Sequence, residues 1–195
     1  MYSCGIIRYD RDLCGKVVDR DTSRPIPGAV IIGDWSKFQP TVAGATYWPY
    51  RVAETSSDNN GDFCLKGSGL VFFVDDPWII VFKSGYDHLD DFKHNHKERG
   101  IYLKERGTSP YDANKVIWSW DRALIQLKPL SIEQREESYR KPDHHSFSIS
   151  SDSPQIQMFQ AELEKERDAI SEWRYQRTKA LTEPSSKVDP FFLRR

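Results

Sequence analysis

The sequence contains no apolar run long enough to cross a bilayer, because its longest runs, at residues 29–32 and 78–82, have only the length of a strand. An excess of charge of one sign is also missing, since 28 basic residues stand against 29 acidic ones and the net charge is −1. A chain with this balance has no dominant basic surface for nucleic acid or for an anionic membrane. Met1 is followed by no basic and apolar leader, so the chain as written shows no export signal.

Hydrophobic residues make up 38% of the chain, but aromatic residues make up 13% and supply bulky material for a core. Short runs rich in β-branched and aromatic residues, bounded by Gly, Pro, Asp and Asn, predict a series of strands. They lie at residues 13–19, 29–35, 52–56, 62–65, 70–73, 77–83 and 115–127. The run Asp58-Asn59-Asn60-Gly61 predicts a tight hairpin. This pattern predicts a mainly β protein, an antiparallel sandwich.

The composition changes after Pro129, and five segments are predicted: an N-terminal segment (1–11), the sandwich (12–130), a short helix with a polar linker (131–153), an amphipathic helix (154–183) and a loose tail (184–195). Ser131 and Gln134 have the spacing of a capping box at the start of the short helix. Ser153-Pro154 predicts the start of the second helix.

The second helix carries an apolar stripe that Glu166 interrupts. The stripe consists of Ile156, Phe159, Leu163, Ile170 and Trp173. We expect it to dock on the sandwich or cover a sheet edge, which would bury Trp173. The alternative is a coiled-coil dimer through this helix.

Four motifs follow one another in the first half of the chain. They are Gly15-Lys16-Val17-Val18-Asp19, Pro25-Ile26-Pro27-Gly28-Ala29-Val30, the run from Glu54 to Phe63 with Asn60-Gly61-Asp62-Phe63, and Gly85-Tyr86. Together they resemble the carboxypeptidase regulatory-like family, whose fold is a transthyretin-like (prealbumin-like) β-sandwich of about seven strands. The resemblance covers residues 12–128. The long segment at 35–50, the extra residue Ser57 and the C-terminal helices depart from the family pattern.

The resemblance implies a module without an active site. Members of the family occur beside peptidases, in outer-membrane and surface proteins, and as exported proteins that stand alone. We therefore expect a non-enzymatic accessory binding or structural module of the cell envelope or periplasm, with no catalytic, cofactor or metal residues. If Met1 is the true start and no leader precedes it, the cytoplasm is the expected compartment.

Aromatic residues gather in the predicted long loop after the second strand. They are Trp35, Phe38, Tyr47, Trp48 and Tyr50. Aromatic side chains on a loop can stack on sugars or anchor a peptide, so this loop is the predicted recognition surface for a protein or carbohydrate partner. The alternative is that the rings fold back and cover the rim of the sandwich.

Histidines and carboxylates alternate at residues 87–96, where His88, His94 and His96 have side chains suited to zinc or iron. Intradiol ring-cleaving dioxygenases are β-sandwiches with a similar opening, and they bind ferric iron through two Tyr and two His. The matching residues here are Tyr47 or Tyr50, Tyr86, His94 and His96. Those enzymes place the His pair in a proline-rich apolar strand, whereas lysines surround it here, so the metal-dependent enzyme is the alternative hypothesis. His144-His145 fall in the predicted linker.

Three cysteines are present, Cys4, Cys14 and Cys64, and taken alone they indicate free thiols in a cytosolic protein. Side-chain alternation, with Leu13 and Val17 directed inward, directs Cys14 outward, and Cys64 is directed outward likewise between Phe63 and Leu65. The resemblance implies that the two strands are neighbours in one sheet. On that basis we predict a Cys14–Cys64 disulfide, an oxidising compartment and an unpaired Cys4.

Overall fold

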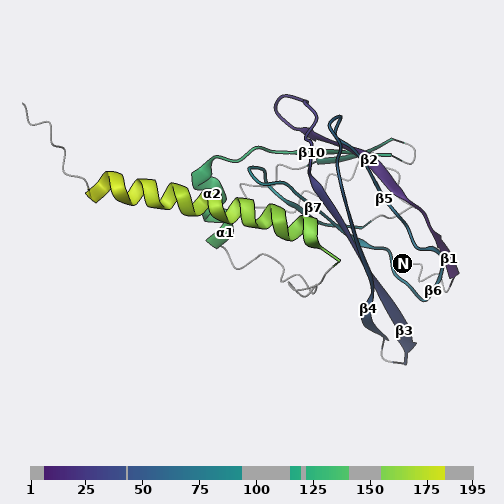
Figure 1. Ribbon diagram of the computed structural model, residues 1–195. Helices are drawn as coiled ribbons and strands as arrows, with labels where there is room; N and C mark the ends of the chain where they lie inside the picture. The colour runs from purple at the N-terminus through teal and green to yellow at the C-terminus, as the bar shows by residue number, and fades with distance from the viewer. Residues whose placement is uncertain (1–6, 43, 94–114, 120–121, 141–154, 183–195) are drawn as a thin grey trace, which may run out of the picture.

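The computed structural model describes residues 7–42, 44–93, 115–119, 122–140 and 155–182. Within these ranges ten strands form three sheets, and two helices follow them in the chain. The strands gather in one body, and helix α2 (Gln157–Thr182) lies beside it and extends away from it (Figure 1). The predicted mainly β fold with a C-terminal helical extension is confirmed.

The first four-stranded sheet has the order β5-β2-β10-β9. Its strands are β2 (Leu13–Asp19), β5 (Asp62–Leu65), β9 (Lys115–Ser119) and β10 (Arg122–Leu127). β2 pairs antiparallel with β5 but parallel with β10. The prediction of an antiparallel sandwich is therefore wrong for this one pair. A parallel pair needs a long crossover, and the chain between β2 and β10 supplies it by passing through the second sheet.

The second four-stranded sheet has the order β4-β3-β7-β8 and is antiparallel throughout. Its strands are β3 (Val30–Thr41), β4 (Gly44–Ser56), β7 (Trp78–Phe82) and β8 (Leu89–Lys93). β3 and β4 remain paired as far as Thr41 and Gly44, so the predicted loop at residues 35–50 is instead a long hairpin. Aromatic residues on both strands favour this pairing. We call residues 36–42 and 44–50, which project beyond the neighbouring strands, the arm (Figure 1).

The third sheet is a two-stranded antiparallel ribbon. β1 (Ile7–Asp10) pairs with β6 (Gly69–Phe72), and Ile7 lies opposite Phe72. Part of the predicted N-terminal segment is therefore a strand. We call this pair of strands the ribbon.

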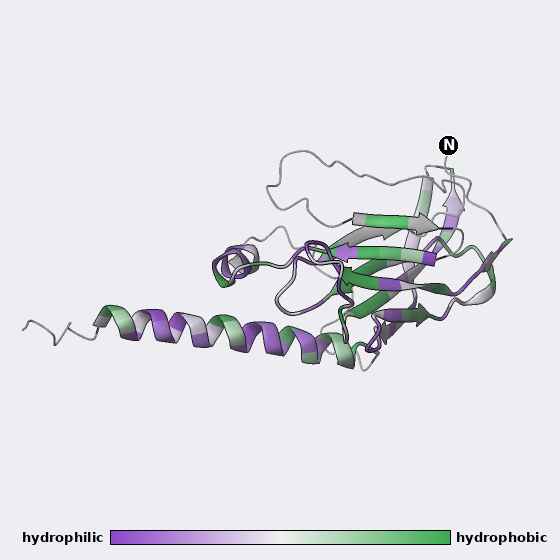
Figure 2. Ribbon diagram, turned by 90° about the horizontal axis from the view of Figure 1, so that it is seen from above, coloured by the Kyte–Doolittle hydropathy of each residue, from purple (hydrophilic) through white to green (hydrophobic). Residues whose placement is uncertain are grey.

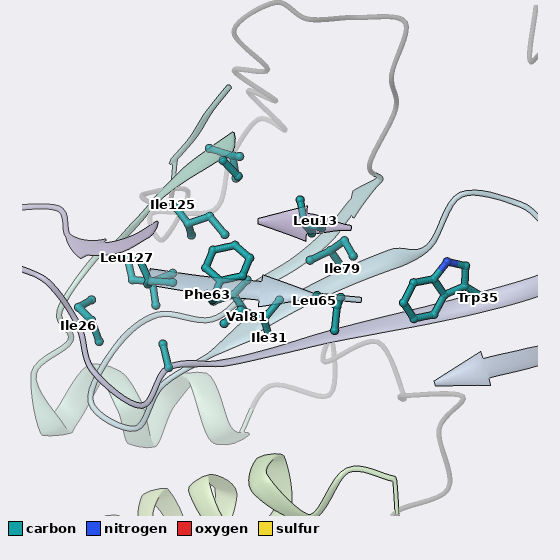
Figure 3. Close-up of a cluster of buried hydrophobic side chains, with 14 of the residues drawn as sticks. Leu13, Ile26, Ile31, Trp35, Phe63, Leu65, Ile79, Val81, Ile125 and Leu127 are labelled. Atoms are coloured by element: carbon teal, nitrogen blue, oxygen red, sulfur yellow. The ribbon is translucent and has the colours of Figure 1, made fainter. Parts of the chain in front are cut away.

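A hydrophobic core lies between the two four-stranded sheets and gives a sandwich-like arrangement (Figure 3). Both sheets contribute side chains that are exposed by 1% or less, namely Val17, Ile31, Leu65, Ile79, Val81, Ile125 and Leu127. Leu13 and Phe63 are buried as well, so the predicted inward positions on β2 and β5 are confirmed.

The predicted hairpin turn at residues 58–61 is present. The Oδ1 atom of Asp58 accepts hydrogen bonds from the amides of Asn60 (2.8 Å) and Asp62 (2.9 Å). Gly61 has a φ of +76°, and a Cβ atom there would collide with the carbonyl oxygen of Val17. Only glycine fits both conditions at this position.

Helix α1 (Ile132–Arg140) begins with the predicted capping box. The Ser131 amide donates to Gln134 Oε1 (2.9 Å), and the Gln134 amide donates to Ser131 Oγ (3.3 Å). Two groups that the helix leaves without an internal partner are thereby satisfied.

Helix α2 begins at Gln157, later than predicted, and a neighbouring strand caps it. The amides of Met158 and Phe159 donate to the two carboxylate oxygens of Glu54 on β4, at 2.8 and 3.1 Å. A carboxylate at this end also interacts favourably with the helix dipole. The predicted cap at Ser153-Pro154 lies outside the described residues.

The first half of α2 docks on the outer face of the second sheet. Phe159 and Ile156, which directly precedes the helix, are each 3% exposed and pack against Val30, Ile32 and Ile80. Docking within one chain, as predicted, is therefore confirmed for this half. The expectation that Trp173 is buried is wrong, because its side chain is only half-buried. The distal part of α2 extends beyond the sheets (Figure 2).

Glu166, expected to interrupt the apolar stripe, belongs to the docking contact together with Glu162. The Arg135 guanidinium donates to both oxygens of Glu166, at 2.8 and 2.6 Å, and Ser84 Oγ donates at 2.8 Å. Lys83 Nζ lies 2.9 Å from Glu162 Oε1. Two buried carboxylates thus join α2 to α1 and to the turn after β7.

Ionisation of both carboxylates is favoured by this setting. Burial by itself would raise the pKa of Glu166, but the hydrogen bonds from Arg135 and Ser84 outweigh burial and hold the pKa below its usual 4.5. Burial is likewise outweighed at Glu162, where Lys165 and Lys83 lower the pKa. Each side chain is therefore a charged, paired carboxylate at neutral pH.

Candidate recognition surface

The arm is fixed to the body by Trp35, which is only 1% exposed. Its indole Nε1 donates to Asp10 Oδ2 at 2.7 Å, and the Arg51 guanidinium lies 4.8 Å from its ring. Trp35 closes one end of the labelled core cluster (Figure 3). The prediction that Trp35 contacts a partner is therefore wrong, because its side chain anchors the base of the arm.

Asp10 connects the ribbon to the arm through a buried network. Besides the Trp35 indole, its carboxylate accepts the amide of Ser68 (2.7 Å) and Arg8 Nη1 (3.1 Å). Arg8 also donates to the carbonyl oxygens of Val74 (2.9 Å) and Asp75 (2.6 Å). Because these groups leave water together, their pairing fixes the geometry between ribbon and arm.

Phe38 is the second predicted contact residue that is buried, at 3% exposure. Its ring lies 5.9 Å from that of Phe73 and 6.2 Å from that of Tyr47, which lies opposite on β4. These side chains cover one face of the arm's base, so for Phe38 the alternative interpretation of rings that fold back holds.

The other three predicted contact residues are exposed on β4. Tyr47, Trp48 and Tyr50 are 54%, 40% and 42% exposed. The ammonium group of Lys37 lies 4.8 Å from the centre of the Tyr50 ring. Tyr50 is the extra residue of a β-bulge, since Trp35 pairs with Arg51 and Ser36 pairs with Pro49.

The ribbon carries an apolar face that was not predicted. The outward side chains are Ile7, Tyr9, Leu70 and Phe72, which are 57%, 65%, 61% and 51% exposed. Opposite positions on the two strands share a face, and Ile7 pairs with Phe72 while Tyr9 pairs with Leu70. The alternation of apolar and charged residues from Ile7 to Asp10 is the pattern that marks β1 as a two-faced strand.

Ribbon and arm lie at the same end of the body, away from the distal part of α2 (Figure 1). The chain leaves the ribbon at Phe72 and pairs with β3 directly afterwards, where the Phe38 amide donates to the Phe73 carbonyl at 2.8 Å. We call the exposed apolar side chains of both parts the apolar surface. It comprises Ile7, Tyr9, Val42, Tyr47, Trp48, Tyr50, Leu70 and Phe72.

Cys14 and Cys64 form the predicted disulfide. They lie directly opposite each other on β2 and β5, with Cα atoms 4.0 Å apart. Cys4 lies outside the described residues.

The residues predicted to bind a metal are not brought together in the described part of the chain. Tyr86 donates its hydroxyl to Asp19 Oδ2 at 3.2 Å, and burial and this carboxylate raise its pKa. Burial would also raise the pKa of Asp19, but hydrogen bonds from Thr22 and Asp21 hold it below its usual value.

His88 lies 3.9 Å from Asp87, and His94, His96, His144 and His145 lie outside the described residues. Among the residues described, no three His, Cys, Asp or Glu side chains form a group that fits a metal ion.

Neither of the two described helices combines the length and apolar character needed to span a membrane. Comparison with models of protein families, with curated protein sequences and with solved structures found no match for this chain.

Proposed function

We propose that this protein is a non-enzymatic binding module that docks a partner protein through its apolar surface. The observation that carries the proposal is the outward face of the ribbon, where two cross-strand pairs, Ile7 with Phe72 and Tyr9 with Leu70, hold apolar side chains that are all more than half exposed. Monomeric proteins rarely leave a contiguous apolar patch of this kind uncovered, and such patches mark sites of interaction.

The chemistry of the ribbon face favours a protein over a carbohydrate. Sugar sites combine flat aromatic rings with hydrogen-bonding groups, whereas Ile7 and Leu70 are aliphatic and no polar side chain interrupts the face. Tyrosine and tryptophan on the arm are the residue types most often found at the energetic centre of protein interfaces.

The buried network beneath the surface supports binding without rearrangement. Asp10, Arg8 and Trp35 fix the ribbon and the arm before any partner arrives. A surface that is already ordered loses less conformational entropy on binding.

The disulfide supports a place for this module in an oxidising compartment such as the cell envelope. The resemblance to the carboxypeptidase regulatory-like family points to the same compartment and to an accessory role. We include in this proposal that the chain belongs to that family and has its transthyretin-like strand topology.

The test compares two matched double variants on arrays of envelope proteins and of glycans. Leu70→Ser with Phe72→Ser removes an aliphatic and an aromatic side chain from the ribbon, and Leu181→Ser with Tyr175→Ser removes the same types from α2, where both are exposed. We expect a bound protein whose affinity falls about tenfold or more in the ribbon variant, because exposed anchors contribute most of the binding energy. The helix variant should bind normally. Binding to a glycan alone, or an equal loss in both variants, would contradict the proposal.

A further inference from the structure

The outer half of β4 is an uncharged sheet edge, where proline and a β-bulge, two devices that protect edges, occur only at its inner limit, at Pro49 and Tyr50. β4 is the terminal strand of its sheet, and residues 44–50 are exposed along their whole length. Their sequence, Gly-Ala-Thr-Tyr-Trp-Pro-Tyr, contains no charged residue. Proteins usually guard such edges with charges or cover them, because unpaired backbone groups there accept another strand. Within the described ranges, no strand pairs with this edge.

The hydrogen bonds of β3 show which backbone groups of β4 face outward from this edge. The Phe38 amide donates to the Phe73 carbonyl, on the side away from β4. Phe38 and Tyr47 are therefore a non-hydrogen-bonded pair, and the N–H and C=O groups of Tyr47 point away from β3. Ala45, two residues earlier, has the same orientation.

Pro49 sets one limit of the usable edge. Its cross-strand partner Ser36 directs its carbonyl to the Asp75 amide at 2.8 Å, so Pro49 also faces outward. Proline has no N–H group, and Pro49 therefore offers only an acceptor. The complete donor and acceptor pairs are those of Ala45 and Tyr47.

We propose that a second copy of this chain pairs with this edge as an antiparallel strand, in a register centred on Thr46. Ala45 then lies opposite Tyr47 of the second copy, and each such pair exchanges two hydrogen bonds. The two-fold symmetry gives both pairs at once and leaves none of the outward groups of Ala45 and Tyr47 without a partner.

Side-chain size supports the same register. Tyr47 faces Ala45 of the second copy, and Trp48 faces Gly44, so each large ring lies opposite a small residue. A register centred on Tyr47 would instead set two tyrosines against each other. It would also place Ala45 opposite Pro49, whose missing N–H leaves one acceptor unpaired in each copy.

Residues 44–50 carry no charge, so no like charges meet across the two-fold axis when a second copy pairs with this edge. The projection of the arm places the two bodies at opposite ends of the joined hairpins (Figure 1). Five residues per copy form an interface well below the usual ~800 Å² per partner, so the dimer is weak and concentration-dependent. The inference does not depend on the proposed function, because it uses the edge of β4 and not the face of the ribbon.

The first experiment measures the mass of the native chain by sedimentation equilibrium over a wide concentration range and compares it with Ala45→Pro. The substitution removes an N–H group that points to solvent in the monomer, so circular dichroism and thermal unfolding should not change. We expect dimer formation to weaken about tenfold or more, because two of the four intermolecular hydrogen bonds are lost. A native chain that remains monomeric near 1 mM, a concentration at which weak association is detectable, contradicts the inference.

The second experiment tests the register by charge exchange at Thr46, which would face its own copy. Thr46→Lys and Thr46→Glu should each weaken the dimer, and an equimolar mixture of the two should restore it as a mixed pair. Gln39→Lys is the matched control, because Gln39 lies opposite Thr46 but on the inner strand β3. Dimer formation that is unaffected by Thr46→Lys, including a dimer through α2, would overturn the inference.

Discussion

Glu166 shows how a single buried charge organises this molecule. Its carboxylate accepts hydrogen bonds from the Arg135 side chain, from Ser84 Oγ and from the Gly85 amide at 3.0 Å. Buried carboxylates are costly unless they are fully paired, and this one is shared between α1, α2 and the turn after β7. The position of α2 therefore depends on an ionised side chain.

The stability of the fold should accordingly depend on acid. The pKa of Glu166 in the folded state lies below 4.5, so its contribution is complete above that pH and is lost as the pH falls through the folded value. In Glu166→Gln, the free energy of unfolding should decrease less between pH 7 and pH 3 than in the native chain. Urea unfolding at several pH values measures this difference. Glu164→Gln, at an exposed site of the same helix, should follow the native curve, and an equal slope in all three proteins would contradict the account.

Helix α2 is an element with two different halves. Its first half is capped by Glu54 and buries Phe159, whose ring meets that of Phe82 edge-on at 5.5 Å. Beyond Ile170, its side chains are mostly exposed. Hydrophilic and hydrophobic residues alternate along the distal part of the helix (Figure 2). The buried contacts of α2 with the body therefore lie in its first half, and beyond Ile170 the Arg174 side chain donates to Glu136 of α1 at 3.1 Å.

Phe159→Ala should cost about 3–5 kcal/mol of unfolding free energy, as for other large core aromatics. Trp173→Ala should cost clearly less, because Trp173 is half-buried and the charged Arg177 guanidinium lies 5.2 Å from its ring. Chemical denaturation of both variants provides the comparison, with Tyr175→Ala as an exposed control. If Trp173→Ala proved the more costly of the two, the assignment of the docking half would be wrong.

Patterns that act over a few residues could be predicted from the sequence. The inward positions of β2 and β5, the turn at Gly61 and the capping box at Ser131 all follow from local periodicity or turn chemistry. The Cys14–Cys64 pairing needed the additional resemblance to a family that places these strands side by side.

Features that depend on contacts between distant segments could not be predicted. The sequence pattern predicts a surface position for Trp35, because nothing near it in the sequence reveals its hydrogen bond to Asp10. The periodicity of α2 predicts that Glu166 only interrupts an apolar stripe, because its partner Arg135 lies on another helix. The ribbon face becomes visible only when β1 and β6 are paired.

At the scale of the whole molecule, its two ends have different characters. One end presents the ribbon and the arm, which hold most of the large exposed apolar side chains among the described residues. The other end presents the charged distal half of α2. Such segregation favours the ribbon and the arm as the site of the proposed association.

The most direct test of this account is site-specific photo-crosslinking in cells that produce the protein naturally. A photoreactive phenylalanine at position 72 should form a discrete adduct with one protein, and the adduct should disappear when Leu70→Ser is added beside it. The same group at position 175, an even more exposed site on α2, should form none. An adduct at position 175 but none at position 72 would contradict the claim that the apolar surface binds a partner protein.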